Sequence, residues 1–327
     1  LGGEAALVKF EPTGDKVLLR RTNQSYRATT VNEAERLSVE QAFASSVLWG
    51  FPVVARDGDQ RLVDATEFLL RDSHGIARRL KSRGEGSFKP DASRSAVFAP
   101  RSRAFPRNTE LEAVVTFVGD DPGPQLRSVA PDPHAVSVHM HHSFIALPEA
   151  GFEPRVFHPE SGYFAMGYAD YSVPITESLE KRLIRRHRLI KKNPSAAVSD
   201  PVEPIIYYLD PGTPEPVRSA LIEGASWWAD AYEAAGFSNA FRVEMLPEDA
   251  DPMDVRYNVI QWVHRSTRGW SYGMSVRDPR TGEILKGHVS LGSLRVRQDL
   301  LIARGMTAAF ADAGDDSETM DMALARI

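Results

Sequence analysis

The chain has 327 residues, of which 42% are hydrophobic and 25% are charged, and its formal net charge is −5. This length predicts two packed domains, and the acidic balance gives no electrostatic reason to expect a nucleic acid as partner. No apolar run approaches the roughly 20 residues of a membrane span, and the absence of cysteine excludes disulfides, thiolate zinc sites and a cysteine nucleophile.

Residues 1–175 are predicted to form a β-rich, antiparallel domain. Two hairpins are expected, one turning at Thr13–Asp15 and the other at Asp57–Asp59, because polar residues with a glycine separate strand-like runs at both places. Further strands are predicted for LEAVVTFVG and AVSVHMHHSFIAL.

Residues 176–202 are expected to be a linker that several prolines punctuate. Its basic run, KRLIRRHRLIKKN, places Leu183, His187 and Ile190 on one face of a predicted helix. The run is compatible with an anion-binding helix or with a solvated helix that pairs with nearby acids. The acidic character of the whole chain favours the solvated helix.

Residues 203–327 are predicted to form a mixed α/β sheet domain, which makes the whole chain α+β. PIIYYLD reads as a strand buried on both faces. Thr213 caps a long helix that Gly236 ends. AFRVEML and YNVIQWVHR are the next predicted strands, and a turn at Asp278–Gly282 joins the last pair.

The final segment, SETMDMALARI, is predicted to begin another helix at residues 317–327. Met320, Ala323, Leu324 and Ile327 recur there at helical spacing and form one apolar stripe. No glycine, proline or amide closes this helix, so we expect it to continue beyond the sequence.

Three histidines, His139, His141 and His142, fall in one predicted strand. Alternation places His139 and His141 on one face, where they could share a metal ion, and His142 on the other. No acidic or histidine ligand stands beside them at a recognisable spacing, so histidines on a polar strand face are the favoured interpretation.

The other histidines do not complete a catalytic motif. His264 and His288 could contact a substrate, although hydrogen-bonded bystanders are the favoured interpretation, and His158 is expected in a turn. None of the nine histidines is followed by glutamate, so H-E-x-x-H is absent, as are the G-x-S-x-G and phosphate-binding glycine motifs. No catalytic residue and no metal ligand is therefore assigned.

Two long runs carry a resemblance to a known family. PIIYYLDPGTPEPVRSALIEGASWWADAYEAAGF and the run from FRVEMLPEDADPMDV to GHVSLGSLRVRQDLL closely resemble the catalytic domain of large bacterial zinc-dependent metallopeptidases of the metzincin type. The segments FEPTGDKVLL and PRVFHPESGYF resemble the β-rich domain of unknown function that precedes it in those proteins. In that family a stretch similar to MALARI leads into a helix bearing H-E-x-x-H-x-x-G-x-x-H.

The resemblance implies that this chain stops before the zinc ligands. Zinc is therefore expected in the parent protein and not in this chain. The resemblance also implies an edge strand, antiparallel to the rest of the sheet, that binds an extended peptide substrate through main-chain hydrogen bonds. ILKGHVSLG is expected to be that strand, with Lys286, Gly287, His288, Val289 and Ser290 lining the substrate. An ordinary edge strand that the first domain covers is the alternative.

The sequence is interpreted as the N-terminal portion of a zinc-dependent metallopeptidase, inactive as this fragment. The alternative is a pseudoenzyme or a non-catalytic binding or inhibitory module that recognises a peptide, a protein or a glycan, which the aromatic residues of SGYFAMGYADY would suit. The family's exported members imply a periplasmic or secreted location. Self-association is expected through apolar residues such as Ile260, Trp262 and Val289, which the missing helix would leave partly uncovered.

Overall fold

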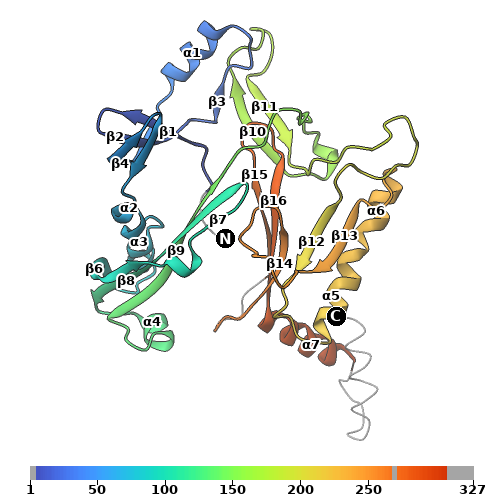
Figure 1. Ribbon diagram of the computed structural model, residues 1–327. Helices are drawn as coiled ribbons and strands as arrows, with labels where there is room; N and C mark the ends of the chain where they lie inside the picture. Colours follow the sequence, from blue (N-terminus) through green and yellow to red (C-terminus); the bar gives the residue numbers. More distant parts are fainter. Residues whose placement is uncertain (1–4, 267–270, 308–327) are drawn as a thin grey trace, which may run out of the picture. The chain divides into compact units, whose positions relative to one another are not determined.

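The computed structural model describes residues 5–266 and 271–307, so the helix predicted for residues 317–327 lies outside the described residues. The chain divides into two compact units (Figure 1). The first contains Leu1–Arg186 and Arg277–Ile284, and the second contains His187–Val276 and Leu285–Ile327. The fold is α+β and rich in antiparallel strands.

The first unit contains three sheets. The strand orders are β1-β2-β4-β5, β11-β10-β3, and β6-β8-β7 with β9 on the other side of β8. The strands are β1 (Val8–Thr13), β2 (Lys16–Arg21), β3 (Tyr26–Arg27), β4 (Ser46–Asp57), β5 (Gln60–Val63), β6 (Ser87–Val97), β7 (Arg103–Ala104), β8 (Asn108–Asp120), β9 (Ala135–Ile145), β10 (Ala165–Asp170) and β11 (Glu180–Ile184). Both predicted hairpins are confirmed, as β1–β2 and β4–β5.

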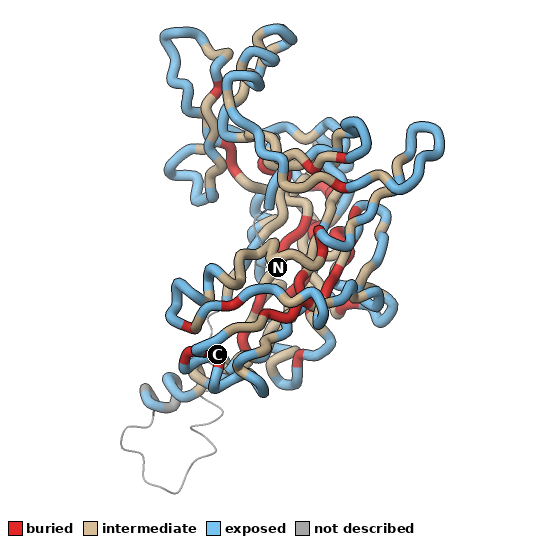
Figure 2. The backbone as a smooth tube through the Cα atoms, turned by 90° about the vertical axis from the view of Figure 1, so that its left-hand side faces the viewer, coloured by how far each residue is buried: buried red, intermediate tan, exposed pale blue. Residues whose placement is uncertain are grey.

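Short helices accompany these sheets: α1 (Glu33–Ala42), α2 (Thr66–Leu70), α3 (Ile76–Ser82), α4 (Pro124–Val129) and the 3-10 turns Ala99–Arg101 and Pro159–Ser161. The core of the unit gathers Phe51 from β4, Phe68 from α2, Phe117 from β8 and Met140 from β9. Figure 2 shows the buried segments of the chain in red. Along β8 the side chains that point into this core alternate with side chains on the opposite face.

The helix predicted for the basic run is wrong, because that run begins with strand β11. Met166 of β10 pairs with Leu183 in an antiparallel register. Leu183 and Ile184 are both buried, one on each face of the strand, because consecutive strand residues point to opposite faces. His187 and Ile190 follow the strand and do not share a helical face with Leu183.

The second unit is built on a five-stranded sheet with the order β13-β12-β14-β16-β15. Its strands are β12 (Ile205–Leu209), β13 (Phe241–Met245), β14 (Asn258–Val263), β15 (Tyr272–Arg277) and β16 (Ile284–Gly292). The pairs β12–β13, β12–β14 and β14–β16 are all parallel.

Two helices, α5 (Val217–Ser226) and α6 (Trp228–Ala234), stand in place of the predicted long helix, and Thr213 does not cap it, because α5 begins after Pro216 without a side-chain cap. Gly236 has a φ of 84° just after α6, in agreement with its predicted place at the helix end. Helix α7 (Ser293–Thr307) follows β16 directly. No helix among the described residues combines the length and the apolar character that a membrane span requires.

The predicted turn between β15 and β16 is present, and the segment Arg277–Ile284 belongs to the first unit. Asp278 donates its N–H to the Glu283 carbonyl at 2.8 Å. Gly282 has a φ of 81°, and a Cβ at this position would lie 2.6 Å from the Ile184 carbonyl oxygen. The guanidinium of Arg27 donates to the Pro279 and Arg280 carbonyls at 2.5 and 2.9 Å. These bonds fix the turn against β3 and the end of β11.

The sheet residues expected to be uncovered are less exposed than predicted. Ile260 is only 6% exposed, so the prediction is wrong for this residue, and Trp262 and Val289 are half-buried. Self-association through this face of the sheet stays a prediction.

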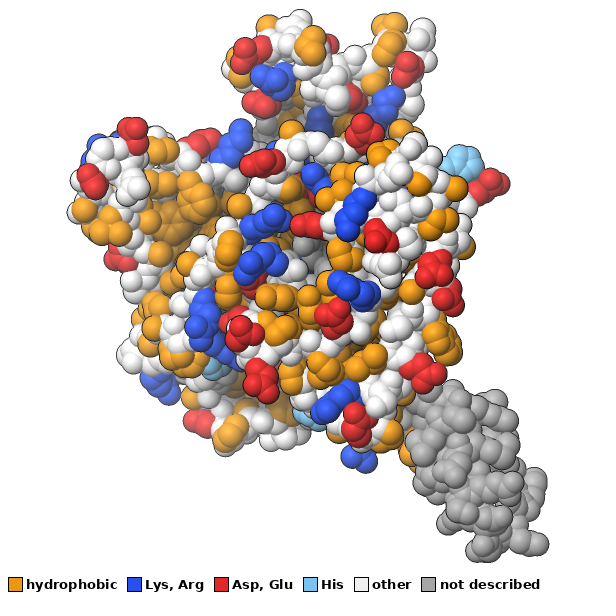
Figure 3. Space-filling model, turned by 45° about the vertical axis from the view of Figure 1, so that its right-hand side comes forward, with side chains coloured by type: hydrophobic (Ala, Val, Ile, Leu, Met, Phe, Trp, Pro, Cys, Tyr) orange, Lys and Arg blue, Asp and Glu red, His pale blue; other side chains and the backbone are white. Residues whose placement is uncertain are grey.

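Figure 3 shows one side of the molecule. Basic, acidic and hydrophobic side chains are interspersed there over the described residues, and no extended patch of one charge sign is visible.

Candidate functional site

The strand expected to bind substrate, β16, is not an edge strand. It lies between β14 and β15 and runs parallel to β14, with Val259 opposite His288 and Ile260 opposite Val289. Its main-chain groups therefore face neighbouring strands of the same sheet on both sides. The prediction that the segment Lys286–Ser290 forms an antiparallel edge is wrong, because the final hairpin inserts its second strand into the sheet and leaves the first outside.

Gly287 accommodates a side chain of the protein itself and not the backbone of a ligand. A Cβ on Gly287 would lie 2.0 Å from the hydroxyl oxygen of Tyr207 on β12. Burial raises the pKa of Tyr207 to about 12, so the phenol stays neutral. The Gly287 N–H donates to Asn258 at 2.7 Å, which completes the local packing.

Lys286 is 3% exposed and supports a loop. Its ammonium group donates to the carbonyls of Pro252 and Asp254, each at 2.7 Å. The Asp254 carboxylate in turn accepts from the Arg256 guanidinium at 2.6 Å. A buried lysine needs such acceptors, and these contacts account for its place in the strand.

The remaining predicted residues of β16 are also enclosed. His288 is buried, and this burial lowers its pKa to about 4, so its ring is neutral at physiological pH. Ser290 accepts a hydrogen bond from Arg265 at 3.2 Å, and Val289 is half-buried. His264 is exposed and bonds to the Ser293 hydroxyl at 2.9 Å.

The edge next to β16 is β15, which ends the strand order of the sheet. Six residues connect β15 to β16, and a connection this short makes the two strands antiparallel, because parallel neighbours need a crossover of about a dozen residues or more. Gly273 and Met274 are exposed on β15. This strand thus runs against the others, and one of its sides pairs with no other strand among the described residues.

A second polar site lies on β8 and β9 of the first unit, on the face opposite the core. Glu110 and Glu112 of β8 are 1% and 4% exposed. Antiparallel pairing sets Glu112 opposite His141 and Glu110 opposite Ser143. Because side chains alternate along each strand, His139 joins the same face. We call Glu110, Glu112, His139 and His141 the His–Glu cluster.

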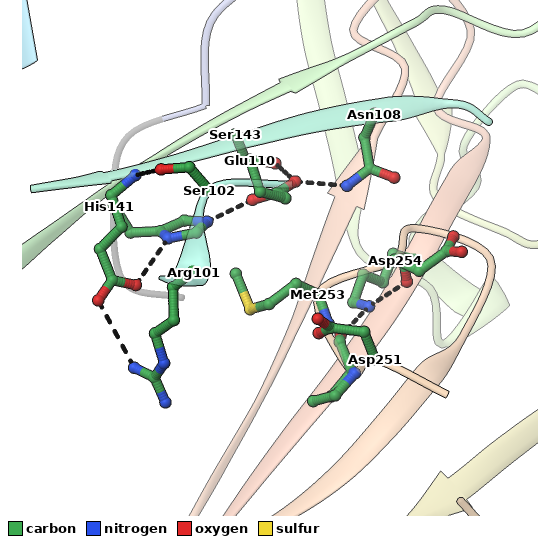
Figure 4. Close-up of polar contacts among 12 residues, drawn as sticks. Arg101, Ser102, Asn108, Glu110, His141, Ser143, Asp251, Met253 and Asp254 are labelled. Carbon is green, nitrogen blue, oxygen red and sulfur yellow. Dashed lines mark hydrogen bonds and ion pairs between the residues drawn. The ribbon is translucent and has the colours of Figure 1, made fainter. Parts of the chain in front are cut away.

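Hydrogen bonds join the His–Glu cluster into a chain. His139 bonds to Glu112 at 2.5 Å, and His141 bonds to Glu112 through Nδ1 at 3.3 Å and to Glu110 through Nε2. Ser143 donates to Glu110 at 2.5 Å, and Asn108 also donates to that carboxylate. Figure 4 shows Glu110 between the His141 ring and these two side chains.

The electrostatics of the cluster follow from this geometry. Burial works to lower the pKa of His141, but its bonds to Glu110 and Glu112 outweigh burial and raise that pKa. Both ring nitrogens face carboxylates, and both can donate only when the ring is protonated. Arg101 adds a second cation, 3.7 Å from Glu112. The protonated His141 ring and Arg101 therefore balance the charges of the two buried carboxylates.

Sequence reasoning identified His139 and His141 but missed their acidic partners. The signal was present in the alternation of Glu110 and Glu112, which matches the alternation of the two histidines. The pairing register that brings these sets together follows only from the structure. His158, expected in a turn, accepts from the Glu160 N–H at 3.3 Å at the start of a 3-10 turn and is exposed.

The described residues do not provide a zinc site. Among residues 5–266 and 271–307, no group of three or more histidine, cysteine, aspartate or glutamate side chains is arranged to hold a metal ion. In the His–Glu cluster the ring nitrogens and carboxylate oxygens bond to one another. The zinc that the metallopeptidase resemblance implies therefore has no ligand set among these residues.

Comparison with known proteins gives one family. A family model described as "Domain of unknown function (DUF5117)" matches residues 2–192, which is more than half of the chain. The match covers the β1–β11 region that contains the His–Glu cluster. No curated protein and no solved structure matches the chain significantly.

Proposed function

The chain belongs to the DUF5117 family, whose description assigns no activity, and we propose from the geometry of its sheet that it supplies the peptide-binding part of a zinc-dependent metallopeptidase. The zinc ligands of this proposal lie outside residues 1–327. A bound zinc ion would supply activation of the attacking water. The substrate is a peptide or protein segment in extended conformation, and the expected location stays periplasmic or secreted.

The observation that carries the proposal is the position of β15. The resemblance to metzincins implies one edge strand that is antiparallel to the rest of the sheet, and β15 has this position and direction. In this proposal β15 takes the substrate-binding role that was predicted for ILKGHVSLG, the segment that forms β16. The four other strands are parallel to one another and form the rest of the sheet on which β15 is held; they are β13, β12, β14 and β16.

An edge strand can bind a peptide by extending the sheet. Every second residue of β15 directs its N–H and C=O away from β16, and an extended peptide can pair with these groups. The exposed Gly273 adds no side chain to obstruct an approaching backbone, since a Cβ there would meet nothing within 4 Å. Met274, 39% exposed, offers an apolar contact to a substrate side chain.

Backbone-methylated peptides test the binding step in the chain itself. Two versions of one peptide carry N-methyl groups on alternate residues, in opposite phase. Only one phase removes the donors that face β15, so we expect one version to bind as the parent peptide does and the other to lose binding in isothermal titration calorimetry. Equal affinity of both versions would show that no strand pairing occurs.

Two proline variants provide the matching test on the protein. Met274→Pro and Ser275→Pro remove the N–H of consecutive residues, of which one faces β16 and the other faces the open side. We expect one variant to lose stability and the other to keep it while peptide affinity falls. If neither variant lowers peptide affinity at retained stability, β15 is not the binding edge.

The catalytic part of the proposal is tested separately. We expect the gene to encode H-E-x-x-H-x-x-G-x-x-H soon after codon 327 and the longer protein to hydrolyse an unfolded protein substrate. A metal chelator should abolish this activity, as should replacement of the motif's glutamate by glutamine. A following sequence without the motif would reject the peptidase and leave a pseudoenzyme or a binding module.

A non-catalytic binding module is the second candidate, and one observation favours it. Phe164 is 81% exposed and the neighbouring Tyr163 is also exposed, whereas large aromatic side chains are usually buried. Exposed aromatic rings commonly bind a glycan or a protein partner. Phe164→Ala should abolish binding to such a partner and leave peptide binding at β15 unchanged. A glycan array and pull-down experiments with the Phe164→Ala chain as control test this candidate.

A further inference from the structure

Arg185 and Arg277, here called the arginine pair, lie on two segments of the first unit that are hydrogen-bonded to each other. Arg185 follows β11, and Arg277 is the last residue of β15. The turn after Arg277 runs alongside the chain at Arg186, whose N–H donates to the Gly282 carbonyl at 3.2 Å and whose carbonyl accepts from the Ile284 N–H at 2.9 Å. These bonds hold the two segments side by side, and the charge of Arg185 acts on Arg277.

The arginine pair carries two like charges in a partly enclosed environment. Both side chains are half-buried. Burial lowers the pKa of Arg277, and the positive charge of Arg185 lowers it further. Two neighbouring cations that have lost part of their water destabilise each other unless a negative group compensates them.

The acids of the turn are committed to other arginines. Asp278 accepts from the Arg280 guanidinium at 2.7 Å and from the Arg280 N–H at 2.8 Å. The charge of Glu283 acts on Arg186 and on Arg280. Within the described part of the chain, no ion pair joins an acid to either member of the arginine pair.

One donor of the arginine pair has no acceptor. Arg185 uses Nη2 to donate to the Ala165 carbonyl at 3.0 Å. Its Nε is buried and has no hydrogen-bond partner among the described residues. Buried donors of this kind are rare because each one loses its bond to water without a replacement. An acceptor that carries negative charge would satisfy this unpaired donor and would also compensate the two positive charges.

We propose that the arginine pair binds an oxyanion, either a carboxylate or a tetrahedral anion such as phosphate or sulfate. Guanidinium groups recognise both classes because their parallel N–H donors match two oxygens of the anion. Arg185 belongs to the basic run that was considered as a possible anion-binding helix, but it lies at the end of a strand and not on a helix. It does not depend on the peptidase proposal.

Anion binding to the full chain tests the proposal. The probes are inorganic phosphate, sulfate and succinate, each compared with sodium chloride at equal ionic strength, with the midpoint of thermal unfolding and calorimetry as readouts. We expect at least one oxyanion to stabilise the chain more than chloride does. Stabilisation by phosphate and sulfate alone identifies a tetrahedral ligand, and stabilisation by succinate identifies a carboxylate. No excess over chloride for any probe overturns the proposal.

Variants locate the binding site. Arg185→Gln and Arg277→Gln should each reduce oxyanion affinity about tenfold or more, the size expected for a lost charge-assisted hydrogen bond. Arg277→Gln should also raise the melting temperature without anion, because it removes one of two repelling cations. Arg182→Gln, on the exposed side of β11, is the matched control and should bind as the wild type does. Unchanged affinity in Arg277→Gln would place any anion elsewhere and overturn the proposal.

A nuclear magnetic resonance signal distinguishes direct binding from a general salt effect. The Nε–H of Arg185 is buried, so its proton resonance should be observable and should shift when the anion accepts from it. A bound anion that leaves this resonance unchanged would contradict the role of Arg185.

Discussion

His141 and His142 are consecutive residues of β9, yet their side chains lie on opposite faces of the strand and their pKa values shift in opposite directions. His141 faces Glu110 and Glu112. His142 packs against Phe68 of the core, with ring centroids 4.8 Å apart. The first ring is stabilised as a cation and the second as a neutral group. Protonation of β9 therefore favours the folded state at His141 and disfavours it at His142.

His142 should make the first unit sensitive to acid. Burial, followed by the charges of His74 and Arg71, lowers its pKa from 6.5 to about 4. A lowered histidine pKa contributes stability that is present above pH 6.5 and is lost as the pH falls toward about 4. The full shift corresponds to roughly 3 kcal/mol, or about 1–2 kcal/mol after allowance for partial exposure.

The variant His142→Phe tests this contribution, because it keeps an aromatic ring beside Phe68 and removes the titration. We expect urea unfolding of the variant to depend less on pH over this range than that of the wild type. Equal pH dependence in both proteins would assign the acid sensitivity to other groups.

His141 should produce the opposite response. Its raised pKa contributes stability that is fully present below the unfolded value near pH 6.5 and is lost as the pH rises through the folded value. His141→Gln is expected to be less stable than the wild type below the folded pKa, since Glu110 and Glu112 lose their cation there. In the wild type the free energy of unfolding should fall as the pH rises through the folded pKa of His141. The diagnostic result is that this decline disappears in the variant. His139→Gln, at a half-exposed position, should retain the decline.

Gly287 should be intolerant of a side chain. In Gly287→Ala the new Cβ would overlap the Tyr207 ring, whose hydroxyl oxygen lies 2.0 Å from the Cβ position. We expect a loss of about 2–4 kcal/mol in the free energy of unfolding, as for other overpacked interiors. Gly273→Ala on the open strand β15 should change stability by less than about 0.5 kcal/mol. In a Tyr207→Leu background the cost of Gly287→Ala should shrink, and an unchanged cost would show that the ring is not the obstacle.

Lys286 should hold the loop before β14. Lys286→Met keeps the length of the side chain but leaves the Pro252 and Asp254 carbonyls without this donor, at an expected cost of about 2–3 kcal/mol. Amide hydrogen exchange should accelerate at Arg256 and Tyr257. Lys192→Met, an exposed substitution in the same unit, should leave both measurements unchanged. Slow exchange in Lys286→Met would mean that the loop is held by other contacts.

Elements with strong local signals were predictable from the sequence. The turns around Gly14 and Gly58 have positive φ angles, which glycine adopts without strain, and both lie where the hairpins were expected. Strand β12 follows from the continuous apolar run IIYYL, β13 from the alternation of apolar and charged residues in FRVEM, and β14 from the mostly apolar run NVIQWV. Gly236 marks the end of α6 for the same conformational reason.

Relationships that depend on long-range pairing were not predictable. The basic run has helical apolar periodicity, with Leu183, Ile184 and Ile190 at i, i+1 and i+7, and only pairing with β10 makes its first residues a strand. The order of β15 and β16 depends on which strand of the hairpin pairs with β14. Likewise, the register between Glu112 and His141 is set across a connection that contains α4, too long for turn chemistry to fix.

The turn at residues 277–284 has a consequence for how the protein is made. Residues 1–186 complete their unit only with this turn, because Arg27 donates to its carbonyls. Domains generally fold as they leave the ribosome, N-terminal first. Here the contacts of Arg27 with the turn form only after the polypeptide has been synthesised through Ile284, when residues 187–276 of the second unit have already been made. A fragment that ends at residue 192, where the matched family region ends, lacks this turn.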